Sequence, residues 1–399
     1  MTTLRHHHAR LALALSLVAL PVGLALASCA DSEQTASSDV DASTLQPGPD
    51  AASGATDAGC EAGSATCVSS ALSCAEADFC PVTSPIDRRN VLLAVSATSA
   101  SDVWAVGSGG TILHHDGKAW TAVLSGTTDT LNAVWGSSPA DVWIASSSST
   151  ILHGNATKWS VVPAFTKGSI RAGRMHALWG ASARDVRVGG QPFSTFDDQL
   201  GISAEGNHLR TLTDGGAGWE VTSGLQGRWT LATVRAIWGS SASDVWMSLD
   251  NGDEEPWARG TLVHGTAASA GTPLTWSSVD SQSTGVLEAI WGAGGEVWAV
   301  GAAGAIRRFT PGAARWATVP AKTTATLHAI WGSGPKDVWA VGDAGTILHF
   351  DGAAWTSATV AFPLGEKPTL RGVGGSGPND VWVVGDAFTL HFTGKKAAR

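Results

Sequence analysis

The sequence has no tyrosine among its 399 residues, only 15% charged residues, and no cysteine beyond position 80. The net charge of −9 gives no support for nucleic-acid binding, which uses a basic face. The motifs G-x-S-x-G and H-E-x-x-H are also missing, which excludes the nucleophile elbow of serine hydrolases and the zinc-binding helix of metalloproteases. These absences favour a non-catalytic protein. A glycoside hydrolase is the alternative, because it needs only two suitably separated carboxylates.

Glycine and tryptophan are abundant instead, with 48 and 19 residues. They mark a unit that is clearest in Leu327–Thr356, where four short apolar runs (LHAIWG, DVWAVG, GTILHF and AAWT) are separated by Gly, Pro, Ser or Asp. Such runs predict strands joined by turns. Asp351-Gly352 lies between two of the runs and predicts a hairpin turn with positive φ at both residues. The unit is therefore predicted to be a four-stranded antiparallel meander.

The DVW core of this unit recurs along the chain at intervals of 39 to 59 residues. It stands at Asp102, Asp141, Asp185 (as DVR), Asp244, Glu296 (as EVW), Asp337 and Asp380. A four-stranded repeat of about 40 to 45 residues is typical of a propeller blade. We therefore predict an all-β fold, a seven-bladed β-propeller of four-stranded antiparallel blades over residues 85–399. All tryptophans except Trp229 and Trp257 keep fixed places in the repeat, and we expect them to form the core between blades.

The last unit, which begins at Leu370, holds only three strands. An unpaired sheet edge invites aggregation, so we expect a strand from the N-terminal side to complete this blade. Phe79–Thr83 precedes the first blade by about the same distance as a fourth strand precedes the next blade elsewhere. It is predicted to close the ring.

Two polar positions recur in the blades. One holds Asp102, Asp141, Asp185, Asp244, Asp337 and Asp380, and the other holds His114, His153, His264, His349 and His391. We expect the aspartates to accept backbone N–H bonds in their own turns and the histidines to bond within their blades, because blade symmetry keeps either set from converging. We therefore expect no catalytic residue, no metal site and no cofactor. The stretch Asp250–Glu255 offers oxygen ligands for Ca²⁺ but lacks the full loop pattern.

The interruptions of the repeat are the predicted binding site. Blade 3 inserts Gln191–Asn207, blade 4 inserts Ser248–Gly260, and the connections Lys167–Arg174 and Ser223–Thr230 are long. Loops of these two kinds open on the same face of a propeller, and binding residues concentrate on loops held by a rigid scaffold. The predicted ligand-binding residues are Arg171, Arg174, Phe193, Phe196, Arg228, Trp229, Asp253 and Trp257. Neutral drift of the insertions is the competing explanation.

The N-terminus predicts export. Residues 1–28 form a predicted lipoprotein signal peptide with the apolar run Leu11–Leu26. The run ends in Leu26-Ala27-Ser28-Cys29, which resembles the bacterial lipobox, and the resemblance implies lipidation of Cys29. Ala30 rather than Asp follows, which the resemblance associates with the outer membrane or cell surface. A multiply acylated cysteine anchors a protein stably.

Two segments follow the signal peptide. Residues 29–59 are predicted to be a disordered tether, because they contain almost no large apolar side chains. Residues 60–84 form a Cys-rich segment that includes the closing strand. Cys60, Cys67, Cys74 and Cys80 predict two disulfides in an exported protein, in any of three pairings. A zinc site is disfavoured, because no C-x-x-C spacing and no nearby His accompany them.

The repeat DVWAVGDAGTILHFDGAAW resembles that of the photosystem II stability and assembly factor family, one of the BNR/Asp-box propellers. The likeness extends over most of residues 91–393. The repeat is also similar to the tectonin repeat of propeller lectins. BNR sialidases use a Tyr nucleophile, which this chain lacks. The first resemblance implies a protein ligand and the second a glycan.

The sequence thus predicts a tethered binding module, a monomer that touches the membrane only through its lipid. Its ligand is expected to be a glycan or a protein on the loop face of blades 2–4. A polysaccharide-acting hydrolase and an envelope assembly factor are the alternatives.

Overall fold

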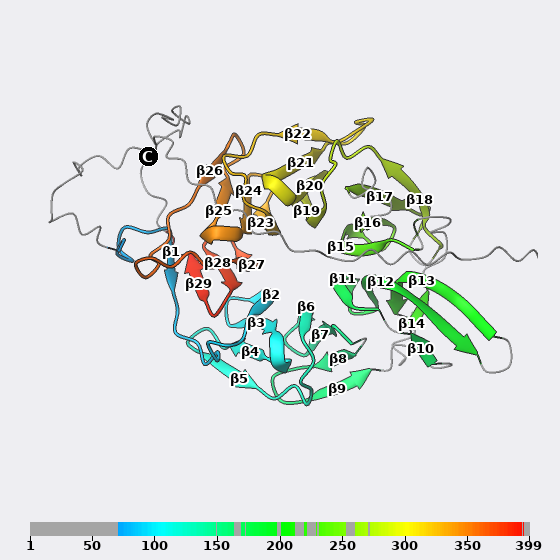
Figure 1. Ribbon diagram of the computed structural model, residues 1–399, viewed down its shortest axis with the longest axis horizontal. Coiled ribbons are helices and arrows are strands. Elements are labelled where there is room, and N and C mark those ends of the chain that lie inside the picture. Colours follow the sequence, from blue (N-terminus) through cyan, green and yellow to red (C-terminus); the bar gives the residue numbers. More distant parts are fainter. Residues whose placement is uncertain are drawn as a thin grey trace, which may run out of the picture. The chain divides into compact units, whose positions relative to one another are not determined.

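The computed structural model describes residues 71–148, 150–162, 169–171, 173–197, 201–211, 219–221, 229, 231–252, 260–269, 272–392 and 394. All of them belong to the second of the two compact units into which the chain divides, Met1–Cys67 and Val68–Arg399. This unit consists of seven antiparallel sheets arranged in a ring (Figure 1), which confirms the predicted seven-bladed propeller. None of the helices in the described part is long and apolar enough to cross a membrane.

The first three blades follow the predicted strand order. Blade 1 is β2 (Leu92–Ser99), β3 (Asp102–Gly107), β4 (Ile112–His115) and β5 (Trp120–Val123); blade 2 is β6 (Leu131–Ser138), β7 (Asp141–Ser146), β8 (Ile151–Gly154) and β9 (Trp159–Val162); blade 3 is β11 (Met175–Ser182), β12 (Asp185–Asp197), β13 (Gly201–Thr211) and β14 (Trp219–Val221), with β10 (Ser169–Arg171) as a fifth strand.

The remaining blades repeat this pattern. Blade 4 is β15 (Thr233–Ser241), β16 (Asp244–Asp250), β17 (Thr261–Thr266) and β18 (Thr275–Val279); blade 5 is β19 (Leu287–Ala293), β20 (Glu296–Gly301), β21 (Ala305–Phe309) and β22 (Ala317–Val319); blade 6 is β23 (Leu327–Gly334), β24 (Asp337–Gly342), β25 (Ile347–Phe350) and β26 (Trp355–Ser357); blade 7 is β27 (Leu370–Gly377), β28 (Asp380–Gly385), β29 (Thr389–Phe392) and β1 (Phe79–Pro81). Short 3₁₀ turns, η1 (Ser108–Gly110), η4 (Ala302–Gly304) and η5 (Asp343–Gly345), follow the second strands of blades 1, 5 and 6.

The hairpin turn before the fourth strand differs from the predicted one. Gly352 has a positive φ of 96°, but Asp351 is not among the residues with positive φ. The Asp351 carboxylate instead accepts the backbone N–H groups of Ala353 and Ala354 at 2.8 and 2.9 Å. The prediction of two positive φ angles is therefore wrong, because the Asp side chain holds the turn through its own hydrogen bonds.

The first strands of neighbouring blades pack side by side around the axis. A glycine follows the first-strand Trp in the repeat, and the Trp of the preceding blade lies against it. A Cβ on Gly180 would lie 2.5 Å from the Trp135 ring, and one on Gly332 would lie 2.6 Å from the Trp291 ring. Only glycine permits this close approach, which explains the Trp-Gly pair in the repeat.

A second set of contacts joins the blades farther from the axis. The fourth-strand aromatic ring of one blade meets the second-strand Trp of the preceding blade edge to face, with ring centroids 5.1 to 5.7 Å apart. The pairs are Trp120–Trp382, Trp159–Trp104, Trp219–Trp143, Trp316–Trp246, Trp355–Trp298 and Phe79–Trp339. Aromatic pairs prefer this geometry. The prediction that the repeat tryptophans form the core between blades is confirmed for these positions.

The predicted closing strand is present. β1 pairs with β29 in antiparallel register, Phe79 opposite Phe392 and Pro81 opposite Leu390. The strand is shorter than the predicted Phe79–Thr83, although a backbone hydrogen bond from Val82 N to the Thr389 carbonyl at 2.8 Å continues the contact beyond Pro81. Phe79 is fully buried and supplies the aromatic ring that a fourth-strand Trp supplies in the other blades.

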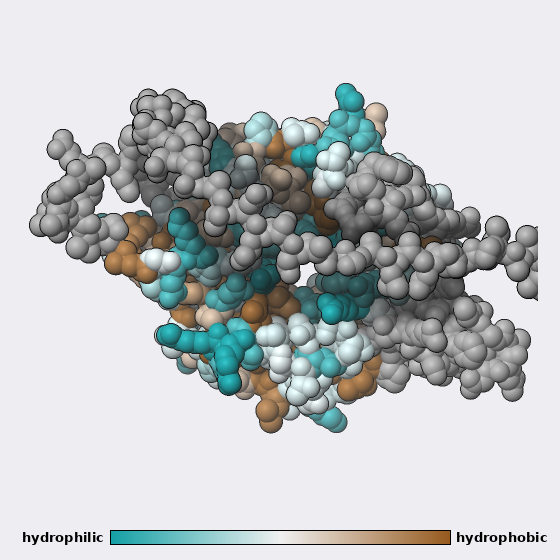
Figure 2. Space-filling model, in the orientation of Figure 1, coloured by the Kyte–Doolittle hydropathy of each residue, from teal (hydrophilic) through white to brown (hydrophobic). Residues whose placement is uncertain are grey.

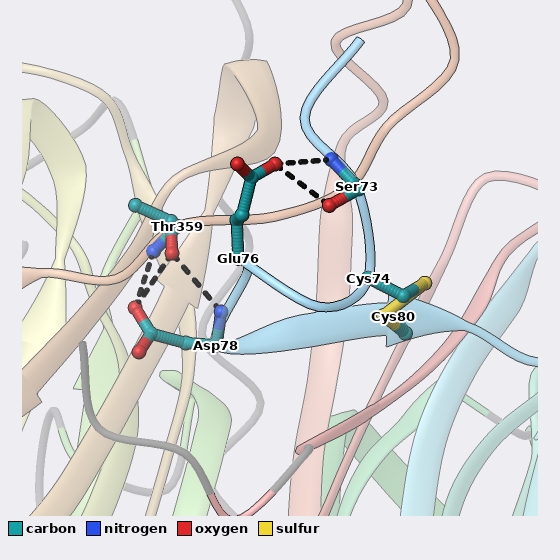
Figure 3. The surroundings of a disulfide bond; sticks show 6 residues. All are labelled: Ser73, Cys74, Glu76, Asp78, Cys80 and Thr359. Atoms are coloured by element: carbon teal, nitrogen blue, oxygen red, sulfur yellow. Dashed lines mark hydrogen bonds between the residues drawn. A yellow bond between two sulfur atoms is a disulfide. The ribbon is translucent and has the colours of Figure 1, made fainter.

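Two further features hold β1 in place (Figure 3). Asp78 accepts hydrogen bonds from the backbone N–H and the hydroxyl of Thr359, at 2.7 and 2.9 Å. A disulfide joins Cys74 to Cys80, and Cys80 lies within β1. The segment that closes the ring is thus tied both to blade 6 and to itself. Cys60 and Cys67 lie outside the described residues, so the second predicted disulfide stays a prediction.

Phe79→Ala tests the closing strand. We expect it to lower the free energy of unfolding by roughly 3–5 kcal/mol, because it removes a fully buried aromatic ring from a core that cannot collapse around the gap. Denaturant unfolding measures the change. Leu124→Ala is the control and should cost less than about 0.5 kcal/mol, because Leu124 is 93% exposed. Equal midpoints for Phe79→Ala and the parent would show that β1 does not stabilise the ring.

Candidate functional site

The repeated aspartates and histidines are structural. In blade 1 the Asp102 carboxylate bonds to His114 Nε2 at 2.7 Å and accepts hydrogen bonds from Trp104 Nε1 and the Thr98 hydroxyl. The same Asp–His bond measures 2.5 to 2.9 Å at His153, His264, His349 and His391. The histidines are therefore partners within their blades, as predicted. The Asp102 carboxylate is bound by side chains rather than by the expected backbone N–H groups.

Two blades replace this cluster with an ion pair. Arg187 takes the place of the second-strand Trp in blade 3, where it is fully buried and bound to Asp185 at 2.8 Å. In blade 5, Arg308 bonds to Glu296 and lies over the Trp298 ring. Each substitution keeps a donor against the carboxylate. The clusters remain separate, and within the described residues no group of three or more His, Cys, Asp or Glu side chains is placed to hold a metal ion.

One face of the ring carries both the blade-to-blade connections and the turns between second and third strands; we call it the connection face. Backbone bonds join the two kinds of loop, as from Gly110 N to Asp129 O at 2.9 Å and from Gly345 N to Pro368 O at 2.8 Å. This confirms the expected shared face. In the view of Figure 2, the hydrophobic areas of the described residues are small and separated by hydrophilic ones.

The channel begins at a ring of seven side chains, one from each blade, which the sequence analysis missed. Each first strand has a β-bulge near its start, where the register skips one residue. The skipped residues, which we call the channel ring, are Leu93, Asn132, His176, Arg235, Glu288, His328 and Arg371. A bulge re-aims its side chain. All members except His328 line a cavity of about 190 Å³.

Small side chains lie directly after the channel ring. The next residue is alanine in six blades and Gly372 in the seventh, and all of them line the same cavity. The channel is thus a narrow apolar tube with polar side chains at its mouth. The sequence signal for this ring is a polar residue after the first apolar one in six of the seven units, as in LN, MH, VR, LE, LH and LR, whereas blade 1 has LL.

Three side chains of the channel ring, two arginines and one histidine, are bound by carboxylates of their own blades. Arg235 bonds to Asp250 at 2.6 Å, His328 to Asp343 at 2.8 Å, and Arg371 to Asp386 at 3.0 Å. The Asn132 amide donates to the Met175 carbonyl at 2.6 Å, across the boundary between blades 2 and 3. These bonds fix the orientation of four side chains at the mouth.

His176 is held neutral. Burial lowers its pKa to about 4, and the positive charges of Arg235 and Arg174 lower it further in the same direction. At neutral pH this imidazole therefore offers one donor and one acceptor but no charge. It is suited to bind a polar group rather than an anion.

Two of the predicted insertions come together in blade 3. β12 and β13 are longer than the corresponding strands of the other blades and extend beyond the sheet (Figure 1). β10, from the connection between blades 2 and 3, pairs with β12, with Ser169 opposite Phe196 and Arg171 opposite Ser194. The predicted residues Arg171, Phe193 and Phe196 thus belong to one three-stranded ribbon. The backbone of Arg174 is bonded to Gln191 at 2.8 and 3.1 Å, and its side chain is exposed.

The other predicted residues are placed only in part. Trp229 is half-buried against the core of blade 4, and its carbonyl accepts the Asn207 amide at 2.7 Å, which ties the connection to β13. Arg228, Asp253 and Trp257 lie outside the described residues. Asp250, a candidate Ca²⁺ ligand, bonds to Arg235 and to the backbone N–H of Gly252. The rest of that candidate, from Asp253 to Glu255, is not described.

The lowered pKa of His176 predicts how stability depends on pH. The unfolded side chain takes up its proton near pH 6.5, whereas the folded one resists protonation down to about pH 4. The stabilisation is complete above pH 6.5 and is lost as the pH falls toward 4. Over this range the free energy of unfolding should fall by roughly 2 kcal/mol. This is less than the free energy that corresponds to the whole pKa shift, because the imidazole ring is partly exposed. Urea unfolding between pH 7 and 4 measures this loss. In His176→Gln, the free energy of unfolding should fall by that much less than in the parent over the same pH range. An unchanged slope would contradict the buried neutral state.

No protein-family model matches the chain, and no curated protein matches it. Among solved structures, it is similar to YCF48 bound to a D1 peptide, with 16% identity, a TM-score of 0.58, and coverage of 79% of this chain and 96% of that chain. It is also similar to YCF48 from Cyanidioschyzon merolae, with 15% identity, a TM-score of 0.58, and coverage of 79% and 99%.

A third similar structure is that of a streptogramin B lyase, with 13% identity, a TM-score of 0.52, and coverage of 75% of this chain and 92% of that chain. At these identities the similarity concerns the fold, and a fold hosts many functions. The YCF48 structures fit the resemblance of the repeat to the photosystem II assembly factor family. The chain is a seven-bladed β-propeller with structural neighbours among assembly factors and enzymes.

Proposed function

We propose that this protein is a non-catalytic binding module that holds a peptide segment of a protein partner on the connection face of blades 2 to 4. The observation that carries the proposal is the pairing of β10 with β12, which joins two separate interruptions of the repeat into one ribbon. Neutral drift of independent insertions gives no reason for them to pair. Peptides commonly bind by adding a strand to such a sheet, where main-chain bonds supply affinity.

Two observations favour a peptide over a glycan. In the ribbon β12 is the middle strand, paired with β10 and β13, and the outer edge of the β13 extension is the side to which another extended backbone would add. One structural neighbour, YCF48, was solved with a peptide bound. A glycan ligand and a hydrolase are the alternatives. One structural neighbour, the streptogramin B lyase, is an enzyme, and for this reason the hydrolase is retained as an alternative. An array of peptides beside an array of glycans, each followed by mass spectrometry for turnover, separates all three. Saturable glycan binding without peptide binding would overturn the proposal, and so would cleavage of a bound compound.

Trp257→Ala tests the place of the site. We expect peptide affinity to fall by about 30-fold or more, because an aromatic anchor often carries over 2 kcal/mol. The melting temperature should stay unchanged, because the residue lies in an insertion outside the repeat. Trp229→Ala should lower both affinity and stability, since Trp229 packs on the blade 4 core. Val161→Ala, an exposed control on β9, should change neither. Full peptide affinity in both tryptophan variants would show that the peptide binds at another place on the protein.

We further propose that the propeller is tethered to a bacterial envelope through Cys29. The motif Leu26-Ala27-Ser28-Cys29 supports this, and it precedes the segment that leads to β1. The anchor would place the binding face outside the membrane, as a surface binding module or an envelope assembly factor requires.

Cys29→Ser tests the tether. We expect the variant to be released in soluble form or to accumulate as an uncleaved precursor, because its N-terminal residue can no longer accept the lipid. Fractionation with detection of the N-terminus measures this, and Cys74→Ser serves as a cysteine control that should keep the anchor. A mature Cys29→Ser protein that still sediments with membranes would contradict lipidation.

A further inference from the structure

The channel ring carries one charge that the structure does not balance. In blades 4, 6 and 7, the second-strand residue that pairs with the residue just before the bulge is followed by an aspartate, and this aspartate binds the ring side chain of the same blade, Arg235, His328 or Arg371. In blade 6 this is Asp343, after Gly342, which pairs with Leu327. In blade 5, Gly301 pairs with Leu287, so the equivalent residue is Ala302. Its methyl group cannot pair with Glu288.

Glu288 therefore differs from the ring residues of blades 4, 6 and 7 both in the type of its side chain and in the lack of a partner in its own blade. Its side chain is acidic where blades 4 and 7 have an arginine and blade 6 a histidine, and within the described residues this side chain has neither an ion pair nor a hydrogen bond. Arg235, the neighbour in blade 4, is already held by Asp250, which accepts from both Nε and Nη2 at 3.1 and 2.6 Å. His328, the neighbour in blade 6, is held by Asp343.

The other half of the ring supplies no counter-charge. Blades 1 and 2 contribute Leu93 and Asn132, which are uncharged. Blade 3 contributes His176, which burial and nearby arginines keep neutral. The mouth of the channel thus bears the carboxylate of Glu288 against a floor of alanine side chains. A carboxylate beside apolar surface is costly unless a cation joins it.

The cavity limits what can enter. Its volume of about 190 Å³ is below the range of roughly 300–1,000 Å³ that whole small-molecule ligands occupy. It therefore suits one long side chain or one amine rather than a folded element. Lysine and arginine combine an apolar stem with a charged head, which matches an alanine-lined tube with a carboxylate at its rim.

We propose that the mouth of the channel binds one cationic group, an ammonium or guanidinium, with Glu288 as its counter-charge. If the proposed function holds, this group is a lysine or arginine of the bound peptide, and the channel selects partners by that residue. The preference for a cation rests on the channel ring alone and stands apart from the ribbon of blade 3.

The test uses the full chain and short probes. Titration followed by NMR compares Ac-Ala-Lys-Ala-NH2 with its Gln and Glu counterparts. We expect the Lys peptide to bind with at least tenfold higher affinity than either, because a hydrogen bond to a charged group is worth about that factor or more. Agmatine and H-Ala-Ala-Ala-NH2 then distinguish a free amine and an N-terminal amine from a side chain.

Glu288→Gln should reduce binding of the Lys peptide by at least about tenfold. Glu366→Gln, which removes the same charge from an exposed connection outside the cavity lining, should leave it unchanged. Equal affinity for all three peptides, or binding that survives Glu288→Gln, would overturn the inference. If agmatine binds and Glu288→Gln abolishes this binding, while no peptide of the array binds, the cation site in the channel is supported and the proposed function is wrong. If peptides bind regardless of charge, the proposed function holds and the channel site fails.

Discussion

The edge-to-face contact between a fourth-strand ring and the preceding blade's second-strand Trp is the interaction on which the propeller depends. Each blade is a single thin sheet that cannot bury both of its faces alone. The aromatic pairs, together with the Trp-on-Gly contacts nearer the axis, bury those faces against the next blade. Such a core is complete only when every blade has a neighbour on both sides, so the ring is stable as a whole rather than blade by blade.

The blade 3 exception shows which part of this contact is essential. Arg187 replaces the Trp, and its guanidinium donates to the Ala242 carbonyl of blade 4 at 2.9 Å. This polar link accompanies an edge-to-face contact between His208 of blade 3 and Trp276 of blade 4, with ring centroids 6.0 Å apart, while the Asp185 carboxylate offsets the buried charge. The boundary tolerates a change of chemistry but retains a direct connection between blades. This boundary also lies beside the ribbon formed by β10, β12 and β13, where the repeat is most altered.

The repeat made the fold predictable from the sequence. It did not reveal the channel ring. Seven copies of one pattern reveal strand order, core positions and a missing fourth strand, which led to Phe79. The ring position instead holds Leu, Asn, His, Arg, Glu, His and Arg in turn. Its orientation comes from a backbone bulge, which a polar residue type at this position does not reveal by itself. The pairing of β10 with β12 was equally invisible, because it joins an insertion to a connection that share no pattern. Conversely, the Asp351 turn shows that even a strong local motif admits another backbone geometry.

The position of β1 sets the order in which this molecule can be completed. Thr389 donates to the Val82 carbonyl across 307 residues of chain. Closing so long a loop costs entropy that no local contact offsets until the other blades exist. β1 is therefore synthesised before the other strands of the ring but is the last of them to pair. An incomplete chain leaves blade 7 without its fourth strand and Phe79 without the rings it packs against. Synthesis and folding are thereby linked: the ring closes only after β29 has emerged, and a product truncated before β29 lacks the partner of β1.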